Sequence, residues 1–578
     1  MLMSYEGARV VRSCPLEEHP RPQAKRKDVF ILNGEWDFEI NKNKDIPASF
    51  EKMILVPFAV ETELSGITQR VAKDDFLHYH RTFDIPEGLE HKIAILHFDA
   101  VDQIADVFVN GELVAHHEGG YTPFIAKLKG LKQTGNVIDV TVSDDTDSEI
   151  FARAKQMNKN GGIWYTPTSG IWQSVWLEFV PENYIESFKL YPDLDKKTLK
   201  IKATFVGEVK DAVAEVTYKG KGIANGVFDE KGETTIRLGR SVHPWSPEEP
   251  NLYDLLLKDG EDVVESYFAM RKFSSIMHEG HLVLALNNKP YFASGVLDQG
   301  YWPESGLTAP TDQSLINDVK LLKDMGFNMV RKHIKIEPMR WYYHCDRLGL
   351  LVMQDFITGG APYKKILINL RPFIEFNFND TKPRIHKLLG RGNPESKAQF
   401  LKDMAPIVDH LFNVPSLYCW VLFNEGWGQF DTAETYKKLL ALDNTRTIDA
   451  NSGWYDQKVG DYSSRHIYFR KVKIRHDNVR MLSLSEFGGY SLKTPGHMFD
   501  EKSFGYKEYK TIEDLNLGMK KLYETEIVPL MKKEGLSTTV YTQLTDVEQE
   551  INGLVTYDRK ITKIDPELMR SLNAMLKF

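Results

Sequence analysis

The chain has 578 residues, of which 42% are apolar and 27% charged, a globular composition with room for about three to five folding units. Its net charge of −8 and the lack of a long run of Lys and Arg argue against nucleic-acid partners. No stretch approaches the roughly 18 to 20 continuous apolar residues of a membrane-spanning helix. The composition therefore predicts a soluble protein of several domains, with neither a nucleic-acid nor a membrane partner.

The cysteines and the N-terminal segment give no sign of a secreted or redox-active protein. Cys14, Cys345 and Cys419 are odd in number, widely spaced and without a CxxC pair, so a disulfide framework and a zinc ribbon are both disfavoured. Residues 1–27 are polar and lack the apolar core of roughly 7 to 15 residues that a signal peptide needs. We therefore expect a cytoplasmic protein.

Short segments with alternating apolar residues run through the first third of the chain. Examples are residues 92–98 and 104–109, and the turn pair Asn110-Gly111 follows the second of them. Alternation of this kind is typical of antiparallel sheets that pack face to face. It predicts a jelly-roll-like β-sandwich over residues 1–181.

A second group of alternating segments follows the first. Residues 198–205, 212–218 and 233–238 all show the pattern within a stretch of about 90 residues, a length that suits an immunoglobulin-like fold. We therefore predict an Ig-like β-sandwich over residues 182–273.

From residue 274 onward the pattern changes to strands that alternate with helices. Residues 312–325 have the apolar spacing of a helix, and Gly326 ends it. Strand-like apolar runs occupy residues 327–330, 350–353, 417–423, 446–450, 466–469, 481–485 and 538–542. Because no Gly-rich phosphate loop follows the first of these strands, residues 274–578 favour a (β/α)8 TIM barrel over a doubly wound sheet.

Two glutamates directly follow two of these apolar runs. Glu425 comes after residues 417–423, and Glu486 comes after residues 481–485. In a TIM barrel the active site lies at the C-terminal ends of the strands, so both side chains are expected there. Hydrolysis of an acetal needs such a pair, because one protonated acid assists the leaving oxygen and one carboxylate attacks the anomeric carbon or activates water. A single glutamate after a strand is more often an ion-pair or helix-cap residue, so the prediction depends on the pair.

Further polar side chains near the predicted strand ends can support these carboxylates. Their types can shift the pKa of a neighbouring carboxylate, orient it by hydrogen bonding and bind sugar hydroxyls. They are Arg331, His333, Asp355, His466 and Tyr468. Other chemistries have less support, since neither a GxSxG serine motif nor an HExxH metal motif occurs. We expect no metal and no cofactor.

Several motifs give the chain a resemblance to glycoside hydrolase family 2, the group that contains β-galactosidases, β-glucuronidases and β-mannosidases. They include LNGEW at residues 32–36, VFVNG at 107–111, SGIWQ at 169–173, GFNMVRKH at 326–333 and the pair Asn424-Glu425. The resemblance covers nearly the whole chain. It implies a sugar-binding sandwich, an Ig-like sandwich and a catalytic barrel, in that order.

The resemblance also implies roles for individual residues. Glu425 would be the general acid/base and Glu486 the nucleophile that forms a glycosyl-enzyme. Asn424 would hydrogen-bond the sugar 2-hydroxyl, and Tyr468 would hold the nucleophile. These roles imply retention of configuration, for which the two carboxyl groups should lie about 5 to 5.5 Å apart.

Departures from the family pattern bear on the sugar. Family glucuronidases carry an Asn-x-Lys triplet that grips the substrate carboxylate, and none follows Glu486 here. Lys335 lies close to His333 and Arg465 precedes His466, so a cation near the sugar C6 would suit a uronic acid. Such side chains are more often solvated or paired within the protein. The sequence leaves a β-galactoside and a β-galacturonide both open.

The walls of the predicted cleft are less defined by the sequence. Trp302 and Trp454 are candidates for stacking on a sugar ring, with packing in the core as the equal alternative. The connection over residues 359–393 is long for a barrel. It is expected to form a wall of the cleft or a contact between copies in a homo-oligomer.

The main hypothesis is a retaining exo-β-glycosidase that removes a terminal β-linked hexose or hexuronic acid from a small glycan or glycoconjugate. Three alternatives stay open. A β-glucuronidase would differ in its sugar, a transglycosylase would share the covalent intermediate, and a noncatalytic carbohydrate-binding protein would keep the architecture alone.

Overall fold

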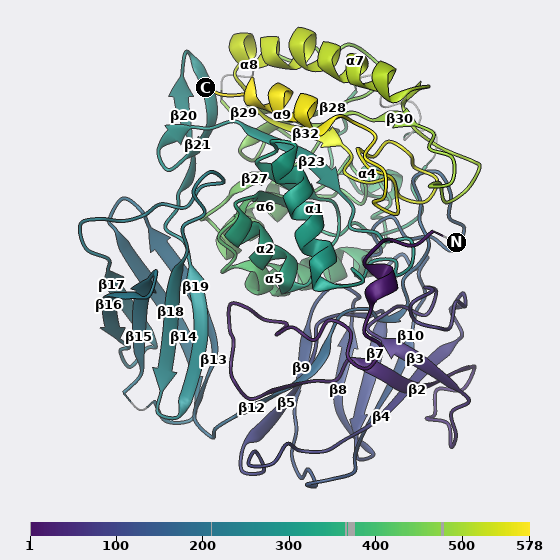
Figure 1. The fold of residues 1–578 in the computed structure, drawn as a ribbon, viewed down its shortest axis with the longest axis vertical. Helices are drawn as coiled ribbons and strands as arrows, with labels where there is room; N and C mark the ends of the chain where they lie inside the picture. The colour runs from purple at the N-terminus through teal and green to yellow at the C-terminus, as the bar shows by residue number, and fades with distance from the viewer. Residues whose placement is uncertain (1, 210, 365–366, 368–375, 476–478) are drawn as a thin grey trace.

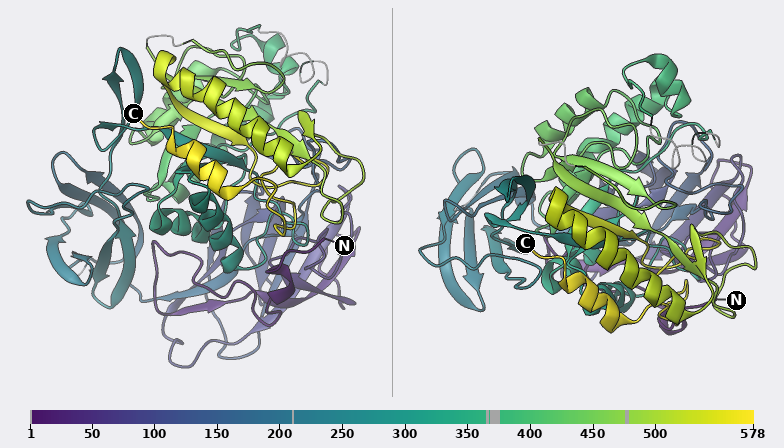
Figure 2. Two further views of the ribbon diagram at one scale, coloured as in Figure 1. Left: turned by 45° about the horizontal axis from the view of Figure 1, so that its top comes forward. Right: turned by 90° about the horizontal axis from the view of Figure 1, so that it is seen from above.

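The computed structural model describes residues 2–209, 211–364, 367, 376–475 and 479–578, and Figure 1 shows their course. Two β-sandwiches lie side by side, and a barrel of strands and helices covers them both (Figures 1 and 2). The fold class predicted from the sequence is confirmed.

The first sandwich pairs a six-stranded antiparallel sheet, in the order β3-β2-β4-β10-β7-β8, with a four-stranded sheet, in the order β1-β12-β5-β9. Every second side chain of β7 is buried, as the alternation in its sequence predicts. The strand bounds are β1 Val29–Ile31, β2 Gly34–Asn41, β3 Lys52–Val56, β4 Phe76–Phe83, β5 Ile93–Phe98, β7 Ile104–Val109, β8 Glu112–Glu118, β9 Phe124–Lys127, β10 Asn136–Ser143 and β12 Val175–Val180. A short pair, β6 (Val101–Asp102) and β11 (Gly170–Ile171), lies beside these sheets.

The second sandwich packs a three-stranded sheet, β13-β14-β17, against a four-stranded sheet, β16-β15-β18-β19. Its strands are β13 Tyr184–Asp193, β14 Thr198–Val206, β15 Val213–Tyr218, β16 Lys221–Val227, β17 Glu233–Arg237, β18 Tyr253–Asp259 and β19 Asp262–Phe268. Arg26 ties the two sandwiches together, because its guanidinium bonds Glu178 of β12 at 2.9 Å and Asp262 of β19 at 2.7 Å. The N-terminal segment thus contacts both sandwiches and links them through Arg26.

The barrel is an eight-stranded parallel sheet in the order β27-β26-β25-β24-β23-β32-β29-β28. Its strands are β23 Ala293–Asp298, β24 Met329–Lys332, β25 Leu351–Asp355, β26 Leu417–Val421, β27 Thr447–Asp449, β28 Tyr462–Ile467, β29 Met481–Gly488 and β32 Leu536–Thr542. The ring closes between β27 and β28, where the amide of Asp461 donates to the carbonyl of Ile448 at 2.8 Å. A small sheet of β20 (Phe273–His278), β21 (His281–Leu286) and β22 (Lys289–Pro290) leads into it.

Helices surround the barrel, and α7 and α8 run across one side of it (Figure 2). Their bounds are α1 Asp312–Asp324, α2 Met339–Leu348, α4 Pro383–Leu388, α5 Pro394–Leu411, α6 Thr432–Leu442, α7 Ile512–Leu522, α8 Val528–Glu534 and α9 Pro566–Ala574, with a π-helical turn at Tyr523–Ile527 and a 3-10 turn at Gly7–Arg9. The strands β30 (Tyr490–Leu492) and β31 (Lys507–Tyr509) form a separate pair. Among the described helices, none has both the length and the apolar character needed to cross a membrane.

Three details of the predicted barrel differ from the structure. The sequence pattern does not predict β23, whose six buried residues include a serine, a glycine and an aspartate that break up the apolar run. It placed a strand at 466–469, whereas β28 begins at Tyr462 and ends at Ile467. It also expected helices throughout, but the described residues between β27 and β28, and between β28 and β29, form loops. Part of the 359–393 connection, residues 365–366 and 368–375, lies outside the described residues.

Candidate active site

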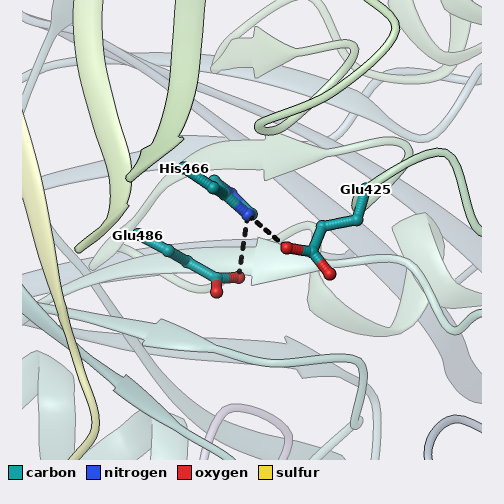
Figure 3. Close-up of side chains that lie close together, drawn as sticks. All are labelled: Glu425, His466 and Glu486. Carbon is teal, nitrogen blue, oxygen red and sulfur yellow. Dashed lines mark hydrogen bonds and ion pairs between the residues drawn. The ribbon is translucent and has the colours of Figure 1, made fainter. Parts of the chain in front are cut away.

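Glu425 and Glu486 converge at one end of the barrel. Glu425 lies just beyond β26, and Glu486 lies near the C-terminal end of β29. One carboxylate oxygen of each, together with one ring nitrogen of His466, falls in a group whose members all lie within 4.8 Å of one another. In Figure 3 the two carboxylates point toward each other, with the imidazole of His466 beside both.

His466 joins the two carboxylates. Its Nδ1 atom lies 2.8 Å from Oε1 of Glu425 and 3.7 Å from Oε1 of Glu486 (Figure 3). Its Nε2 atom lies 3.1 Å from the hydroxyl of Ser452, which follows β27 and donates to the hydroxyl of Ser485 at 2.9 Å. The imidazole is thus held on both sides and bridges the pair.

Arg331 of β24 fixes Glu486 from the other side. Its side chain is fully buried, and its Nη1 atom donates to Oε1 of Glu486 at 3.2 Å and to the carbonyl of Ser485 at 3.0 Å. The same guanidinium makes a two-pronged bond to Asp355, at 2.9 and 3.0 Å, and donates to Oδ1 of Asn424 at 2.8 Å. Burial alone would lower the pKa of Arg331, but the charges of Asp355 and Glu486 outweigh it and raise that pKa. The residue is a permanent cation that links three strands.

Asp355 and His333 extend this network away from the pair. Nδ1 of His333 lies 2.8 Å from Oδ2 of Asp355, at the end of β25. Burial, followed by the charges of Lys155 and Arg331, holds the pKa of His333 well below its ordinary value, so this imidazole is neutral. Burial also raises the pKa of Asp355, against the opposing effect of Arg331.

Tyr468 donates its hydroxyl hydrogen bond to Oε2 of Glu486. Its ring stacks on Tyr506 with centroids 3.8 Å apart and planes at 4°, which fixes its orientation. Burial and the charge of Glu425 raise the pKa of Glu486, whereas His466, Arg331 and Tyr468 lower it. Two carboxylates this close cannot easily both be ionised, and these three neighbours favour the charge on Glu486.

The backbone at Glu425 adopts a left-handed conformation, with φ of 52°, which is rare for a residue other than glycine. Its amide donates to the carbonyl of Ser452 at 3.0 Å, and this bond helps to fix the turn. Strained residues of this kind cluster at functional sites. Next to it, Asn424 accepts a bond from Arg331 through its oxygen, so its amide NH2 is the group it can offer a ligand.

Lys335 does not reach the carboxylate pair. Its buried ammonium donates to the carbonyls of Gly300 and Leu307, at 2.7 and 2.6 Å, and to Glu337 at 2.8 Å. Burial lowers the pKa of Lys335 to about 8. All three of its donors are used inside the protein, which favours the alternative of a structurally paired lysine over a sugar-binding one.

Arg465 and Trp302 are also directed elsewhere. Arg465 is half-buried and donates to the carbonyl of Ser464 at 2.7 Å, because neighbouring side chains on β28 point to opposite faces and His466 takes the inner one. Trp302 is covered by the guanidinium of Arg559, 3.6 Å from the ring centroid, and lines a separate cavity beside α1. The described contacts therefore support neither residue as a sugar-binding group.

Trp454, by contrast, lies near the pair. Together with Trp427 and Tyr455 it lines a small, open hollow whose wall also includes Glu425. Trp164, from the first sandwich, packs on Trp427 with ring centroids 5.3 Å apart. Trp427 was not among the site residues predicted from the sequence, although it stands two residues after Glu425. Trp164 and Tyr506 were not predicted either, because the local sequence carries no such signal for them.

Glu425, His466 and Glu486 are close enough to hold a metal ion. The guanidinium of Arg331 lies 3.2 Å from Glu486, however, and a second cation beside it would be repelled. The contacts of this group therefore suit proton transfer and nucleophilic attack better than metal binding.

Comparison with known proteins assigns the family. Three family models match consecutive parts of the chain: the glycosyl hydrolase 2 galactose-binding domain-like model at residues 51–173, the glycosyl hydrolases family 2 model at 183–271, and the family 2 TIM barrel model at 279–491. The chain belongs to glycoside hydrolase family 2.

Curated relatives carry several activities in their names. A β-galactosidase of Lactococcus lactis subsp. lactis is 28% identical over 450 residues, which cover 74% of this chain and 40% of the relative. A β-glucuronidase of Streptococcus agalactiae is 25% identical over 432 residues, which cover 69% of this chain and 67% of the relative. The chain spans 34% of the length of a third relative, a β-galactosidase of Leuconostoc mesenteroides that is 26% identical.

Solved structures share the whole architecture. A β-D-glucuronidase of Dictyoglomus thermophilum superposes with a TM-score of 0.73 at 17% identity, covering 96% of this chain and 98% of the other. A β-galacturonidase of Eisenbergiella tayi bound to galacturonate superposes with a TM-score of 0.71 at 19% identity, covering 97% of this chain and 100% of the other. These likenesses establish the fold of all three domains.

Proposed function

We propose that this protein is a retaining exo-β-glycosidase that hydrolyses a terminal β-linked hexopyranoside by double displacement. The observation that carries the proposal is the closeness of Glu425 and Glu486, whose facing oxygens lie within 4.8 Å. Retaining glycosidases place their two carboxyl groups about 5 to 5.5 Å apart, whereas inverting enzymes leave room for a water between them.

In the first half-reaction, the carboxylate of Glu486 attacks the anomeric carbon while Glu425 gives its proton to the glycosidic oxygen. The aglycone leaves as an alcohol, and the sugar stays bound as an ester of Glu486. In the second half-reaction Glu425 takes a proton from water, whose oxygen attacks the anomeric carbon and releases Glu486. Two inversions give a product with the configuration of the substrate.

The surroundings of the pair support this division of roles. Arg331 and Tyr468 both donate to Glu486, and such donors stabilise a carboxylate and a leaving ester alike. Glu425 is more exposed and lies beside the aromatic hollow of Trp427 and Trp454, where a leaving group can be held. Asn424 offers its NH2 group to the sugar 2-hydroxyl, a contact that strengthens in the transition states of such enzymes.

For the sugar, we propose a β-galactoside or a β-galacturonide. The named activities of the relatives include β-galactosidase, β-glucuronidase and β-galacturonidase. A β-glucuronide is the alternative, and it has less support because no Asn-x-Lys triplet follows Glu486. Exo action is supported by the first sandwich, whose Trp164 packs on Trp427 of the barrel, next to the hollow that Glu425 lines.

The test is hydrolysis of p-nitrophenyl β-glycosides by the wild type and by Glu486→Gln. We expect kcat/KM for the best substrate to fall by roughly 10⁴-fold or more in the variant, because no covalent step remains. NMR of the first-formed product should show the β-anomer. Equal activity in both proteins, or an α-anomer as the first product, would defeat the proposal; activity in neither would favour a noncatalytic sugar-binding protein.

A further inference from the structure

A loop of the first sandwich, residues 144–169 between β10 and β11, reaches over the barrel. The amides of Arg153 and Gly162 donate to the carbonyl of Thr358 at 3.0 Å and to the side chain of Gln549 at 2.8 Å. Farther along the loop, the amide of Thr166 donates to Glu548 at 2.7 Å. The loop is therefore fixed to the C-terminal end of the barrel, where the carboxylate pair lies.

Lys155 of this loop is a buried cation without a hydrogen-bond acceptor among the described residues. Its side chain is 8% exposed, and its nearest carboxylate oxygen, Oε2 of Glu550, lies 3.9 Å away. Other buried lysines in this chain are bonded closely, since Lys335 and Lys563 reach carboxylates at 2.8 and 2.6 Å. The ring of Tyr165 lies near the ammonium as well, with its centroid 5.6 Å from Nζ, so the three N–H donors of Lys155 face an aromatic ring and a distant carboxylate.

Glu550 is held by other groups and does not turn toward Lys155. Tyr165 donates its hydroxyl to Oε2, and Asn552 donates to Oε1 at 3.1 Å. Nε2 of Gln299 also donates to Oε2, at 3.5 Å. Glu550 thus balances the charge of Lys155 without satisfying its donors.

Lys155 lies toward the end of the barrel that carries the carboxylate pair. Gln299, which donates to Tyr165 of the same loop at 2.6 Å, follows β23 at the barrel end that carries Glu425 and Glu486. Next to burial, the charge of Lys155 is the strongest influence that lowers the pKa of His333, which bonds Asp355. Lys155 therefore lies close to the network that fixes the proposed nucleophile.

We propose that Lys155 binds the carboxylate of a hexuronic acid, so that the sugar removed by this enzyme is a uronic acid. The inference rests on the proposed glycosidase function and narrows it. A carboxylate accepts charge-assisted bonds, which are roughly twice as strong as those to a neutral hydroxyl, and so compensates a buried ammonium best. Lys335 and Arg465, the cations that the sequence offered for this purpose, both have other partners.

The experiment compares Lys155→Met with the wild type on p-nitrophenyl β-D-galacturonide, β-D-glucuronide and β-D-galactoside. Lys159→Met is the matched control, because Lys159 lies in the same loop and is exposed. We expect kcat/KM for the preferred uronide to fall roughly 100-fold in Lys155→Met, because the variant removes one partner of a buried charge pair. For the galactoside, which has no carboxylate, kcat/KM should fall less than tenfold. Lys159→Met should behave as the wild type on all three.

A second variant and a binding measurement test the role of Lys155 even if Lys155→Met does not fold or no substrate is cleaved. If Lys155→Met fails to fold, Lys155→Gln replaces it, and Lys155→Arg should restore part of the uronide preference. Equal losses on uronide and galactoside, no loss on either, or a wild type that cleaves the galactoside alone would each overturn the inference and leave the glycosidase proposal standing. If no substrate is cleaved, the glycosidase proposal fails, and the role of Lys155 is then tested by calorimetry. The wild type should bind free galacturonate or glucuronate at least tenfold more tightly than Lys155→Met does. Equal affinity of the two proteins would overturn the inference about Lys155.

Discussion

Arg331 determines how the proposed nucleophile is presented. Its planar guanidinium meets Asp355 with two parallel bonds and has donors left for Glu486 and Asn424. A lysine at this position has a single ammonium and cannot reproduce the two-pronged bond. The positions of Glu486 and Asn424 are therefore set by one rigid, buried side chain.

Tyr468 provides the first prediction at this scale. Its hydroxyl lowers the pKa of Glu486, which burial raises above the ordinary value. Glu486 attacks only as a carboxylate, so activity is lost as the pH falls through that raised pKa. Removing the hydroxyl in Tyr468→Phe raises this pKa further, and the acid limb of the kcat/KM profile should move to higher pH. Loss of a bond to a charged group should also lower kcat/KM by roughly 10- to 100-fold at the optimum.

The control for this variant is Tyr218→Phe, which removes a comparable tyrosine hydroxyl bond, 2.8 Å to Asn251, in the second sandwich. Its pH–rate profile should match that of the wild type. An acid limb that stays in place in Tyr468→Phe, or moves to lower pH, would show that Tyr468 does not stabilise the charge of Glu486.

At the scale of the element, β24 serves two sides of the barrel wall. Arg331 points inward to Ser485 of β29, whereas the next residue, Lys332, points outward and lies 4.2 Å from the ring centroid of Trp341 in α2. Lys332 and Lys335 share Glu337, at 2.7 and 2.8 Å. The strand thus separates the network around the proposed nucleophile from the ion pairs around Glu337.

Lys335 therefore yields a prediction about stability. Lys335→Met leaves two carbonyls and one oxygen of Glu337 without this donor, and removing one partner of a buried ion pair costs about 3 kcal/mol. We expect a lower urea midpoint for the loss of barrel structure, with an unchanged ratio of uronide to galactoside turnover. Lys320→Met, on the exposed face of α1, should leave the midpoint in place. A changed substrate ratio with an unchanged midpoint would return Lys335 to the sugar site.

The sequence predicted those strands of the barrel whose apolar pattern is visible within a few consecutive residues. Glu425 follows the continuous apolar run at residues 417–423, and Glu486 follows residues 481–485, in which Leu alternates with Ser; both patterns indicate the end of a buried parallel strand. The first barrel strand was missed, because Gly295 and Ser294 interrupt its apolar pattern. For Lys335 the sequence left two roles open for a different reason: a sequence shows a charge but not the acceptors that surround it.

At the scale of the whole molecule, the site is built from two domains. The barrel carries the carboxylate pair, and one loop of the first sandwich brings Trp164 onto Trp427 and carries Tyr165 and Lys155, which we propose to bind the sugar carboxylate. More than 250 residues separate this loop from Glu425 along the chain, so no local pattern connects them. This is why the sequence identified the proposed reacting groups but not the residues proposed to select the sugar.

The central claim is that Glu486 forms a covalent bond to the sugar while Glu425 handles the proton. It is tested most directly with a 2-deoxy-2-fluoro glycosyl fluoride of the preferred sugar, which slows release of the intermediate. Mass spectrometry of the treated protein and its peptides should find one added glycosyl group, located on Glu486. A label on any other residue, or turnover of the natural sugar with no adduct and an inverted product, would contradict the account.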